Sequence, residues 1–132
     1  MKEYRFLRRD DLWNFLSAYR ASEAQAASIV RGLSRTALVD LYNDFVAAQC
    51  LLEVALSEGR LREWSDDARA DAAQAIIAQG REAVQSVLER GQIPVAEASL
   101  KRGNARMLMS ESFFERFGSE ISGEIDRDYW NK

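Results

Sequence analysis

The sequence predicts an all-α fold, a single compact bundle of about five to six helices that spans residues 1–132 as one domain. The chain has one proline and seven glycines, and it is rich in the helix-forming residues Ala, Leu, Glu, Arg and Gln. Apolar residues recur at the helical spacing i, i+3, i+4, i+7, and capping residues stand where these patterns begin and end. Strand-like alternation is nearly absent, and only Glu3–Leu7 is expected to be extended.

The first two helices are predicted between residues 10 and 32. Asp10 and Asp11 can begin the first, and Ser22 can cap a second, alanine-rich helix that Gly32 ends. The apolar face of the first helix comprises Leu12, Trp13, Phe15, Leu16 and Tyr19.

A long third helix is predicted from its N-cap at Ser34 to Gly59. Leu33 and Leu38 have the spacing of a hydrophobic staple around that cap. A buried stripe is then expected at Leu38, Leu41, Tyr42, Phe45, Ala48, Gln49, Leu52, Ala55 and Leu56.

A fourth helix is predicted from its N-cap at Ser65 to Gly91 and Pro94. Its core stripe is expected at Ala72, Ala73, Ile76, Ile77, Gly80, Ala83, Val84, Val87 and Leu88, where the small residues favour close packing against the third helix.

The C-terminal quarter is expected to be helical in shorter pieces. A weaker stretch over Val95–Met109 is interrupted at Gly103-Asn104, and Ser110-Glu111 is expected to cap a final helix. That helix would carry Phe113, Phe114 and Phe117, followed at helix-like spacing by Ile121, Ile125, Tyr129 and Trp130.

The absence of histidine and the presence of one cysteine exclude several kinds of chemistry. Without histidine there is no Ser-His-Asp or Cys-His catalysis and no His-containing zinc site. Phosphate-binding glycine motifs are also missing. We therefore expect no enzymatic activity and no cofactor. Cys50 and Gln49 are interpreted as packed residues of the third helix rather than as functional groups.

The charge distribution bears on partners and location. The net charge is −3, and residues 41–91 hold nine acidic and five basic side chains. Nucleic-acid binders usually carry a basic stripe, so nucleic acid is not expected as a ligand. No apolar run is long enough to span a bilayer, and no secretory signal is evident. We therefore expect a cytoplasmic protein with no membrane partner.

The stretch REWSDDARADAAQ, residues 62–74, is the main candidate for a functional site. Ser65, Asp66 and Asp67 have the residue types that begin a helix, because the hydroxyl accepts from free N–H groups and carboxylates favour the positive end. Two other interpretations stay open. Asp66, Asp67 and Asp71 could hold a divalent cation or perform carboxylate chemistry, or the acidic residues around Trp64 could form a face that binds a protein.

The run EWSDDARADAAQAIIAQGREAVQSVL with Ile93-Pro94 resembles the bacterial family catalogued as domain of unknown function 4240, as does the upstream LSRTALVDLYNDF. The resemblance covers about residues 33–95. The residues that carry the resemblance are Ser65, Asp66, Asp67, Gln79, Gly80 and Arg81. It implies a small helical bacterial domain and no particular activity.

These observations predict a protein-binding module, most specifically an immunity protein that occludes the active site of a cognate bacterial toxin. An acidic face suits toxins whose own sites are basic. The expected partner-binding residues are Glu58, Glu63, Trp64, Asp66, Asp67 and Asp71, with Arg60 and Arg62 at the rim. The alternatives are a carboxylate-dependent enzyme or metal binder, and a homodimer that pairs through Phe113, Phe114, Phe117 and Trp130.

Overall fold

The computed structural model describes residues 4–59, 61–93 and 105–125. These residues form seven α-helices and one 3₁₀ turn, and no strand occurs among them. The elements are α1 (Arg5–Arg8), α2 (Asp11–Ala21), α3 (Glu23–Gly32), α4 (Arg35–Glu58), α5 (Asp66–Gln79), α6 (Arg81–Arg90), α7 (Ala105–Phe117) and η2 (Ile121–Glu124). The all-α prediction is confirmed, with slightly more helices than the five to six expected.

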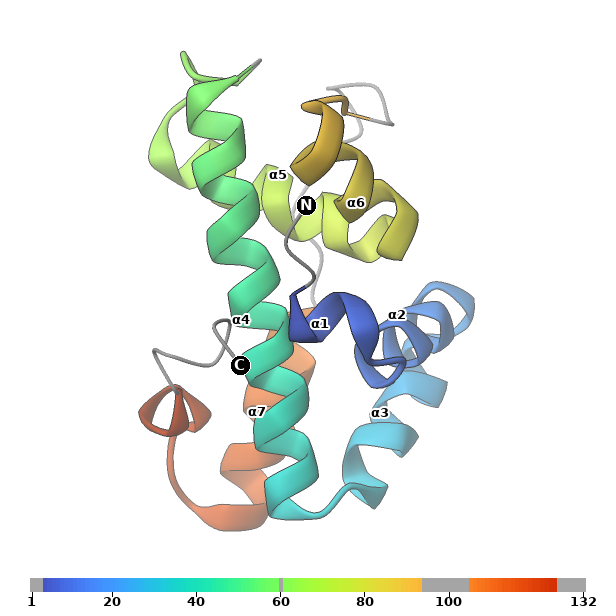
Figure 1. Ribbon diagram of the computed structural model, residues 1–132. Helices are drawn as coiled ribbons and strands as arrows, with labels where there is room; N and C mark the ends of the chain where they lie inside the picture. Colours follow the sequence, from blue (N-terminus) through green and yellow to red (C-terminus); the bar gives the residue numbers. More distant parts are fainter. Residues whose placement is uncertain (1–3, 60, 94–104, 126–132) are drawn as a thin grey trace.

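Helix α4 runs along the whole molecule, and all other elements except α3 pack along its length, whereas α3 packs against α2 and α7 (Figure 1). Helices α5 and α6 lie beside its C-terminal half, while α7 lies beside its N-terminal half and also contacts α3. Residues 41–49 of α4 are all buried, because other helices contact α4 on several sides. The predicted stripe is confirmed except at Ala55, which is only partly buried, and it is only part of what α4 buries.

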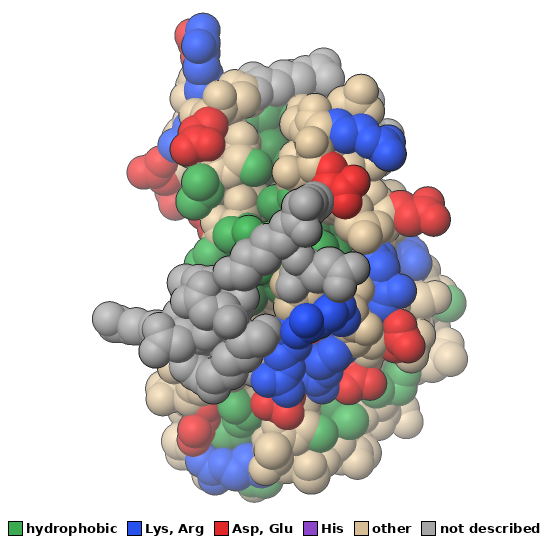
Figure 2. All heavy atoms as spheres, in the orientation of Figure 1, with side chains coloured by type: hydrophobic (Ala, Val, Ile, Leu, Met, Phe, Trp, Pro, Cys, Tyr) green, Lys and Arg blue, Asp and Glu red, His purple; other side chains and the backbone are tan. Residues whose placement is uncertain are grey.

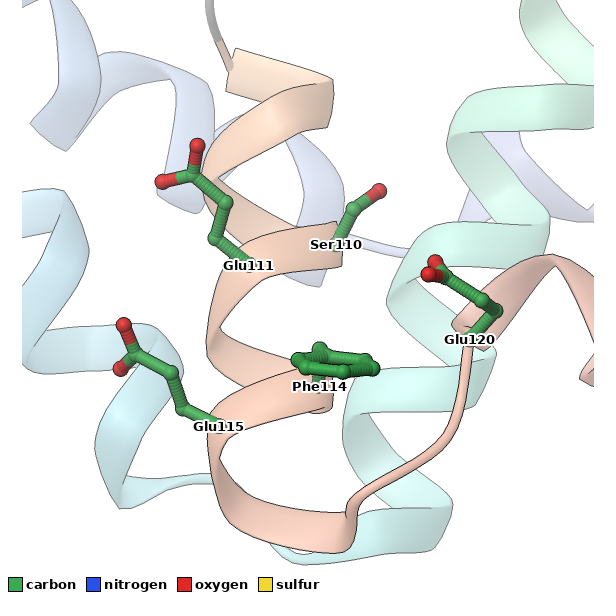
Figure 3. Close-up of a pocket in the computed structure, with 5 residues that line it drawn as sticks. All are labelled: Ser110, Glu111, Phe114, Glu115 and Glu120. Carbon is green, nitrogen blue, oxygen red and sulfur yellow. The ribbon is translucent and has the colours of Figure 1, made fainter.

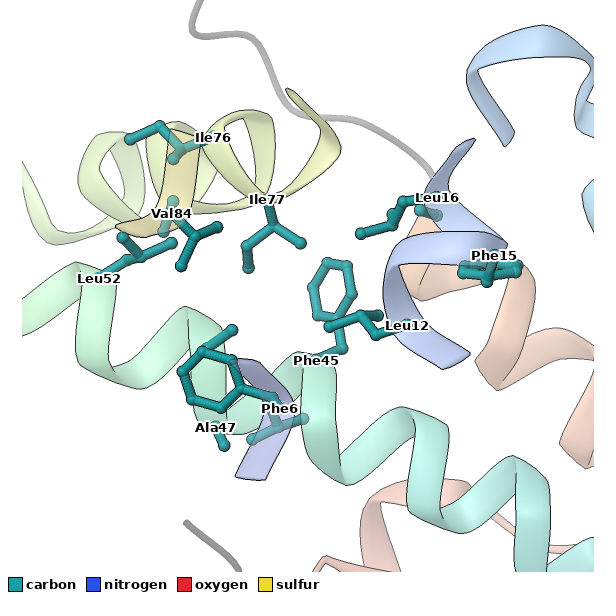
Figure 4. Packing of buried hydrophobic residues seen from close by; sticks show 14 of the residues in the cluster. Phe6, Leu12, Phe15, Leu16, Phe45, Ala47, Leu52, Ile76, Ile77 and Val84 are labelled. Atoms are coloured by element: carbon teal, nitrogen blue, oxygen red, sulfur yellow. The ribbon is translucent and has the colours of Figure 1, made fainter. Parts of the chain in front are cut away.

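The core joins apolar side chains from most of the helices (Figure 4). Phe6 of α1, Leu12 and Leu16 of α2, and Phe45 of α4 are each exposed by 1% or less. Ile76, Ile77 and Val84 bring α5 and α6 onto the same cluster.

Three N-caps that the sequence predicts are formed. The hydroxyls of Ser22, Ser34 and Ser65 accept hydrogen bonds from the backbone N–H groups of Gln25, Ala37 and Ala68 at 3.3, 3.1 and 3.1 Å. Each bond satisfies one backbone donor that a helix end would otherwise leave free. Local sequence thus determines where α3, α4 and α5 begin.

The extended start expected at Glu3–Leu7 is wrong over its described part, because Arg5–Arg8 form a helical turn. Phe6 and Leu7 are both buried, whereas neighbouring residues of a strand would point to opposite faces. The Phe6 carbonyl accepts a hydrogen bond from the Trp13 indole at 2.8 Å, which holds the turn against α2.

The single helix expected from Ser65 to Gly91 is also wrong, since Gly80 divides it into α5 and α6. Gly80 has φ 115° and ψ −178°, a conformation outside the helical region that residues with a Cβ rarely adopt. The guanidinium of Arg20 approaches it and donates to the Ala78 carbonyl at 2.7 Å. Arg81 then donates to the Asp10 carboxylate at 2.6 Å, which ties the break to the start of α2.

The helix start expected at Ser110-Glu111 is also wrong, because α7 already begins at Ala105. Helix α7 continues through both residues, and the Ser110 hydroxyl donates to the Arg106 carbonyl one turn earlier. Ile121 is buried and Ile125 is half-buried, so the described part of the tail does contribute to the core. Residues 95–104, Tyr129 and Trp130 lie outside the described residues.

Candidate functional site

The acidic stretch lies where α4 ends and α5 begins, at one end of the molecule (Figure 1). Leu61 is fully buried and anchors the connecting turn to the core. Ser65 then caps α5, and Asp66 and Asp67 occupy its first turn, near the positive end of the helix dipole. The interpretation of this stretch as a helix start is confirmed.

Arg69 holds this turn together through hydrogen bonds, although the sequence alone did not point to it. Its guanidinium donates to the backbone carbonyls of Leu61, Arg62 and Trp64, and it forms an ion pair with Asp66. The Arg69 side chain is only 14% exposed, whereas that of Asp66 is 96% exposed. The planar guanidinium can serve several acceptors at once. The spacing from Asp66 to Arg69 signals the ion pair, but no sequence pattern signals its bonds to the turn.

The predicted binding residues divide by exposure. Glu58, Glu63 and Asp67 are exposed and, like the half-buried Asp71, have no Lys or Arg at ion-pair distance within the described part of the chain. Acidic side chains accordingly gather over the end of α4 and the start of α5 in Figure 2. Trp64 is half-buried and packs against the core, so part of its ring area is already used in folding. Of the two residues expected at the rim of this face, Arg62 is exposed, and Arg60 is not among the residues that the structure describes.

Metal-binding geometry is not found in the residues that the structure describes, since no group of three or more Cys, Asp or Glu is placed to hold an ion. Asp40 and Asp44 of α4 are also four residues apart, but arginines from α1 and the segment after it pair with them. Asp40 is 4.0 Å from Arg5, and the fully buried Asp44 is 3.5 Å from Arg9.

A second surface lies on α7, where a pocket of about 290 Å³ is lined by Ser110, Glu111, Phe114, Glu115 and Glu120 (Figure 3). Phe114 is 51% exposed. Its ring lies between Glu120 on one side and the two glutamates of α7 on the other. The helical spacing of Glu111, Phe114 and Glu115 could have indicated this arrangement, whereas Glu120 is added by the chain after α7.

The prediction that an apolar patch is exposed for pairing with a second copy of the chain is wrong for two of its three described residues. Phe113 is fully buried, and Phe117 is half-buried and packs against it with ring centroids 4.9 Å apart. The Arg35 guanidinium lies over both rings, 5.2 and 5.3 Å from their centroids. Phe114 alone of these three phenylalanines is exposed, and Trp130 is not among the described residues.

Gln49 belongs to a polar network between α4 and α7. Its side-chain oxygen accepts from Arg106 at 2.7 Å, and its amide donates to Glu53 at 3.3 Å. Arg106 also donates to the Tyr42 hydroxyl at 3.1 Å. The interpretation of Gln49 as a satisfied buried amide is confirmed. Cys50 is exposed rather than packed, so that interpretation is wrong.

Although Cys50 counts as exposed, nearby side chains still shield part of its thiol from water, and this partial desolvation is the main cause that raises the pKa of the thiol. The Glu53 carboxylate adds to the shift, and Arg106 opposes it. A raised pKa lowers the thiolate fraction near neutral pH, which makes Cys50 a poor nucleophile.

Among the helices that the structure describes, none has the length and apolar character needed to cross a bilayer. A search with the whole chain found no match among protein-family models, curated proteins or solved structures. The resemblance to the domain of unknown function 4240 therefore stays a prediction.

Proposed function

We propose that this protein is a protein-binding module that presents a preorganised acidic face to a basic partner. The acidic face consists of Glu58, Glu63, Asp66, Asp67 and Asp71, with Trp64 at its base. The Arg69 contacts are the observation that carries the proposal, because they tie the backbone of the turn that carries Glu63 to the first turns of α5, which carry Asp67. A surface that is already ordered loses less conformational entropy when it binds.

The charges on this face support a basic partner. Asp66 is paired with Arg69, whereas no Lys or Arg of the described residues lies at ion-pair distance from the other four carboxylates. Complementary charge accelerates association and raises specificity. Most specifically, we propose a cytoplasmic bacterial immunity protein that covers the basic active site of a cognate toxin.

The test is a binding measurement with the product of a neighbouring toxin gene. Calorimetry should show that Glu63→Lys with Asp67→Lys weakens binding by at least about 2 kcal/mol, the scale of a lost hot spot. Both side chains are exposed, so the melting temperature should change little. Glu82→Lys and Glu89→Lys on α6 make the same change in net charge on another exposed surface and should leave affinity nearly unchanged.

The Arg69→Lys variant tests preorganisation separately. A lysine ammonium cannot reproduce the planar set of bonds that Arg69 makes to three carbonyls and Asp66. Affinity should therefore fall although the net charge is unchanged. Unaltered affinity in both the Arg69→Lys variant and the Glu63→Lys, Asp67→Lys double variant would remove this face from the proposal.

A further inference from the structure

Glu111 and Glu115 of α7 form a wall shared by two pockets. On one side is the pocket that contains Phe114. On the other is a smaller pocket of about 60 Å³ between α3 and α7, lined by Ala27, Arg31, Leu108, Glu111, Ser112 and Glu115. Both glutamate side chains point away from Phe114 in Figure 3. This surface is separate from the acidic face and comes from different helices.

The smaller pocket contains a buried hydroxyl whose hydrogen-bonding capacity is unused. Ser112 is 92% buried, and its Oγ has no hydrogen-bond partner among the described residues. Buried polar atoms are generally paired, because an unpaired one costs folding free energy. Ser110, two residues earlier, shows the usual solution, since its hydroxyl donates to the Arg106 carbonyl. Ser112 therefore points to a ligand group at this pocket.

The groups around the pocket match an ammonium ion. An ammonium has three N–H donors and no acceptor, and the pocket offers two carboxylates and one hydroxyl as acceptors. The small volume suits this compact ion better than the broad, planar guanidinium. Neither glutamate has an ion-pair partner among the described residues, even though Arg31 lines the same pocket.

We propose that this surface of α7 binds a lysine-bearing segment of a protein partner. The lysine ammonium is bound by Glu111, Glu115 and Ser112, and a neighbouring apolar side chain of the segment packs on Phe114. Half of the Phe114 surface is exposed, and Glu120 adds negative charge beside it. Arg31 also lines this pocket, so its positive charge opposes the entry of an ammonium.

The experiment uses the full chain and three labelled helical peptides, followed by fluorescence anisotropy. The first peptide carries one Lys and one Leu a helical turn apart, and the other two carry Arg or norleucine in place of Lys. The Lys peptide should bind more tightly than the Arg peptide, and the norleucine peptide should not bind. Because a hydrogen bond to a charged group is lost, Ser112→Ala should weaken the Lys peptide about tenfold.

Ser112→Ala also separates binding from folding. It removes a hydroxyl that has no partner, so the melting temperature should stay constant or rise. Glu111→Gln and Glu115→Gln should each weaken the Lys peptide, whereas Glu89→Gln on α6, with the same change in charge, should not. Arg31→Ala should strengthen binding.

Equal affinity of wild type and Ser112→Ala, or equal affinity for the Lys and Arg peptides, would overturn the proposal. Self-association that competes with the peptide would instead assign the surface to a second copy of the chain. The Glu63→Lys, Asp67→Lys variant should bind the peptide normally, so this proposal and that of the acidic face fail independently.

Discussion

Arg9 and Asp44 form an ion pair at the core of the bundle, with Arg9 Nη1 3.5 Å from Asp44 Oδ2. The Asp44 side chain is fully buried in the middle of α4, whereas that of Arg9 is 25% exposed. Arg9 also contacts Asp11 at 2.8 Å. It therefore connects the end of α1, the start of α2 and the central helix.

Removing one partner of this pair should destabilise the protein strongly. Arg9→Ala removes the Arg9 charge from the fully buried Asp44 carboxylate, so the free energy of unfolding should fall by about 3 kcal/mol. Denaturant-induced unfolding of the variant and the wild type measures this loss of free energy. Arg5→Ala is the matched control, because its pair with Asp40 is longer and about a third exposed, and should cost less than about 1 kcal/mol. Equal effects of the two variants would contradict the role of the buried pair.

Gly80→Ala should lower the free energy of unfolding by about 1–3 kcal/mol. The cause is backbone strain, because an added Cβ is unfavourable at φ 115° whatever the surrounding space. Gly32→Ala is the control: nothing lies within 4 Å of the added Cβ and its φ is not positive, so stability should stay equal or rise. Thermal unfolding compares the two, and a harmless Gly80→Ala would show that the break between α5 and α6 does not depend on glycine.

Ser65→Ala should reduce stability by about 0.5–2 kcal/mol, because the Ala68 backbone N–H loses its acceptor. Ser57→Ala provides a control near the end of α4, where the hydroxyl bonds to a carbonyl of its own helix, and should change stability by less than about 0.5 kcal/mol. Chemical denaturation of both variants measures the two changes in the free energy of unfolding. No difference between them would remove the capping role.

Alkylation of Cys50 by iodoacetamide should be slower near neutral pH than alkylation of free cysteine. Partial desolvation of the thiol and the Glu53 carboxylate raise its pKa, so a smaller fraction is thiolate at a given pH. Glu53→Gln removes the negative charge, lowers this pKa and should increase the rate. The pH profile of the alkylation rate should shift to lower pH in that variant, and an unshifted profile would contradict the assignment. The alkylation rate of Cys50 in the unfolded chain serves as the reference rate for a free cysteine thiol.

Addition of Mg²⁺, Ca²⁺ or Mn²⁺ should leave the melting temperature nearly unchanged. The described carboxylates do not form a group able to hold an ion, and Asp66 is already paired with Arg69. Scanning calorimetry with and without sub-millimolar metal provides the measurement. A rise of several degrees would show tight binding to the folded state and favour the carboxylate-enzyme interpretation.

The sequence by itself determined the all-α class and the starts of α3, α4 and α5. These follow from interactions within a few residues, such as the bond from Ser65 to the Ala68 N–H, so a local pattern is enough to predict them. The core stripe of α4 follows likewise from helical periodicity.

Only the tertiary structure decided which polar residues are buried and which apolar residues are exposed. Asp44 is buried and forms an ion pair with Arg9, which comes from the segment between α1 and α2, and Phe113 is buried while its neighbour Phe114 is not. Such differences depend on contacts between distant segments, which helical spacing does not specify. Arg69 is a further example. Its spacing from Asp66 predicts their ion pair, but no local pattern predicts its hydrogen bonds to the three backbone carbonyls of the turn before α5.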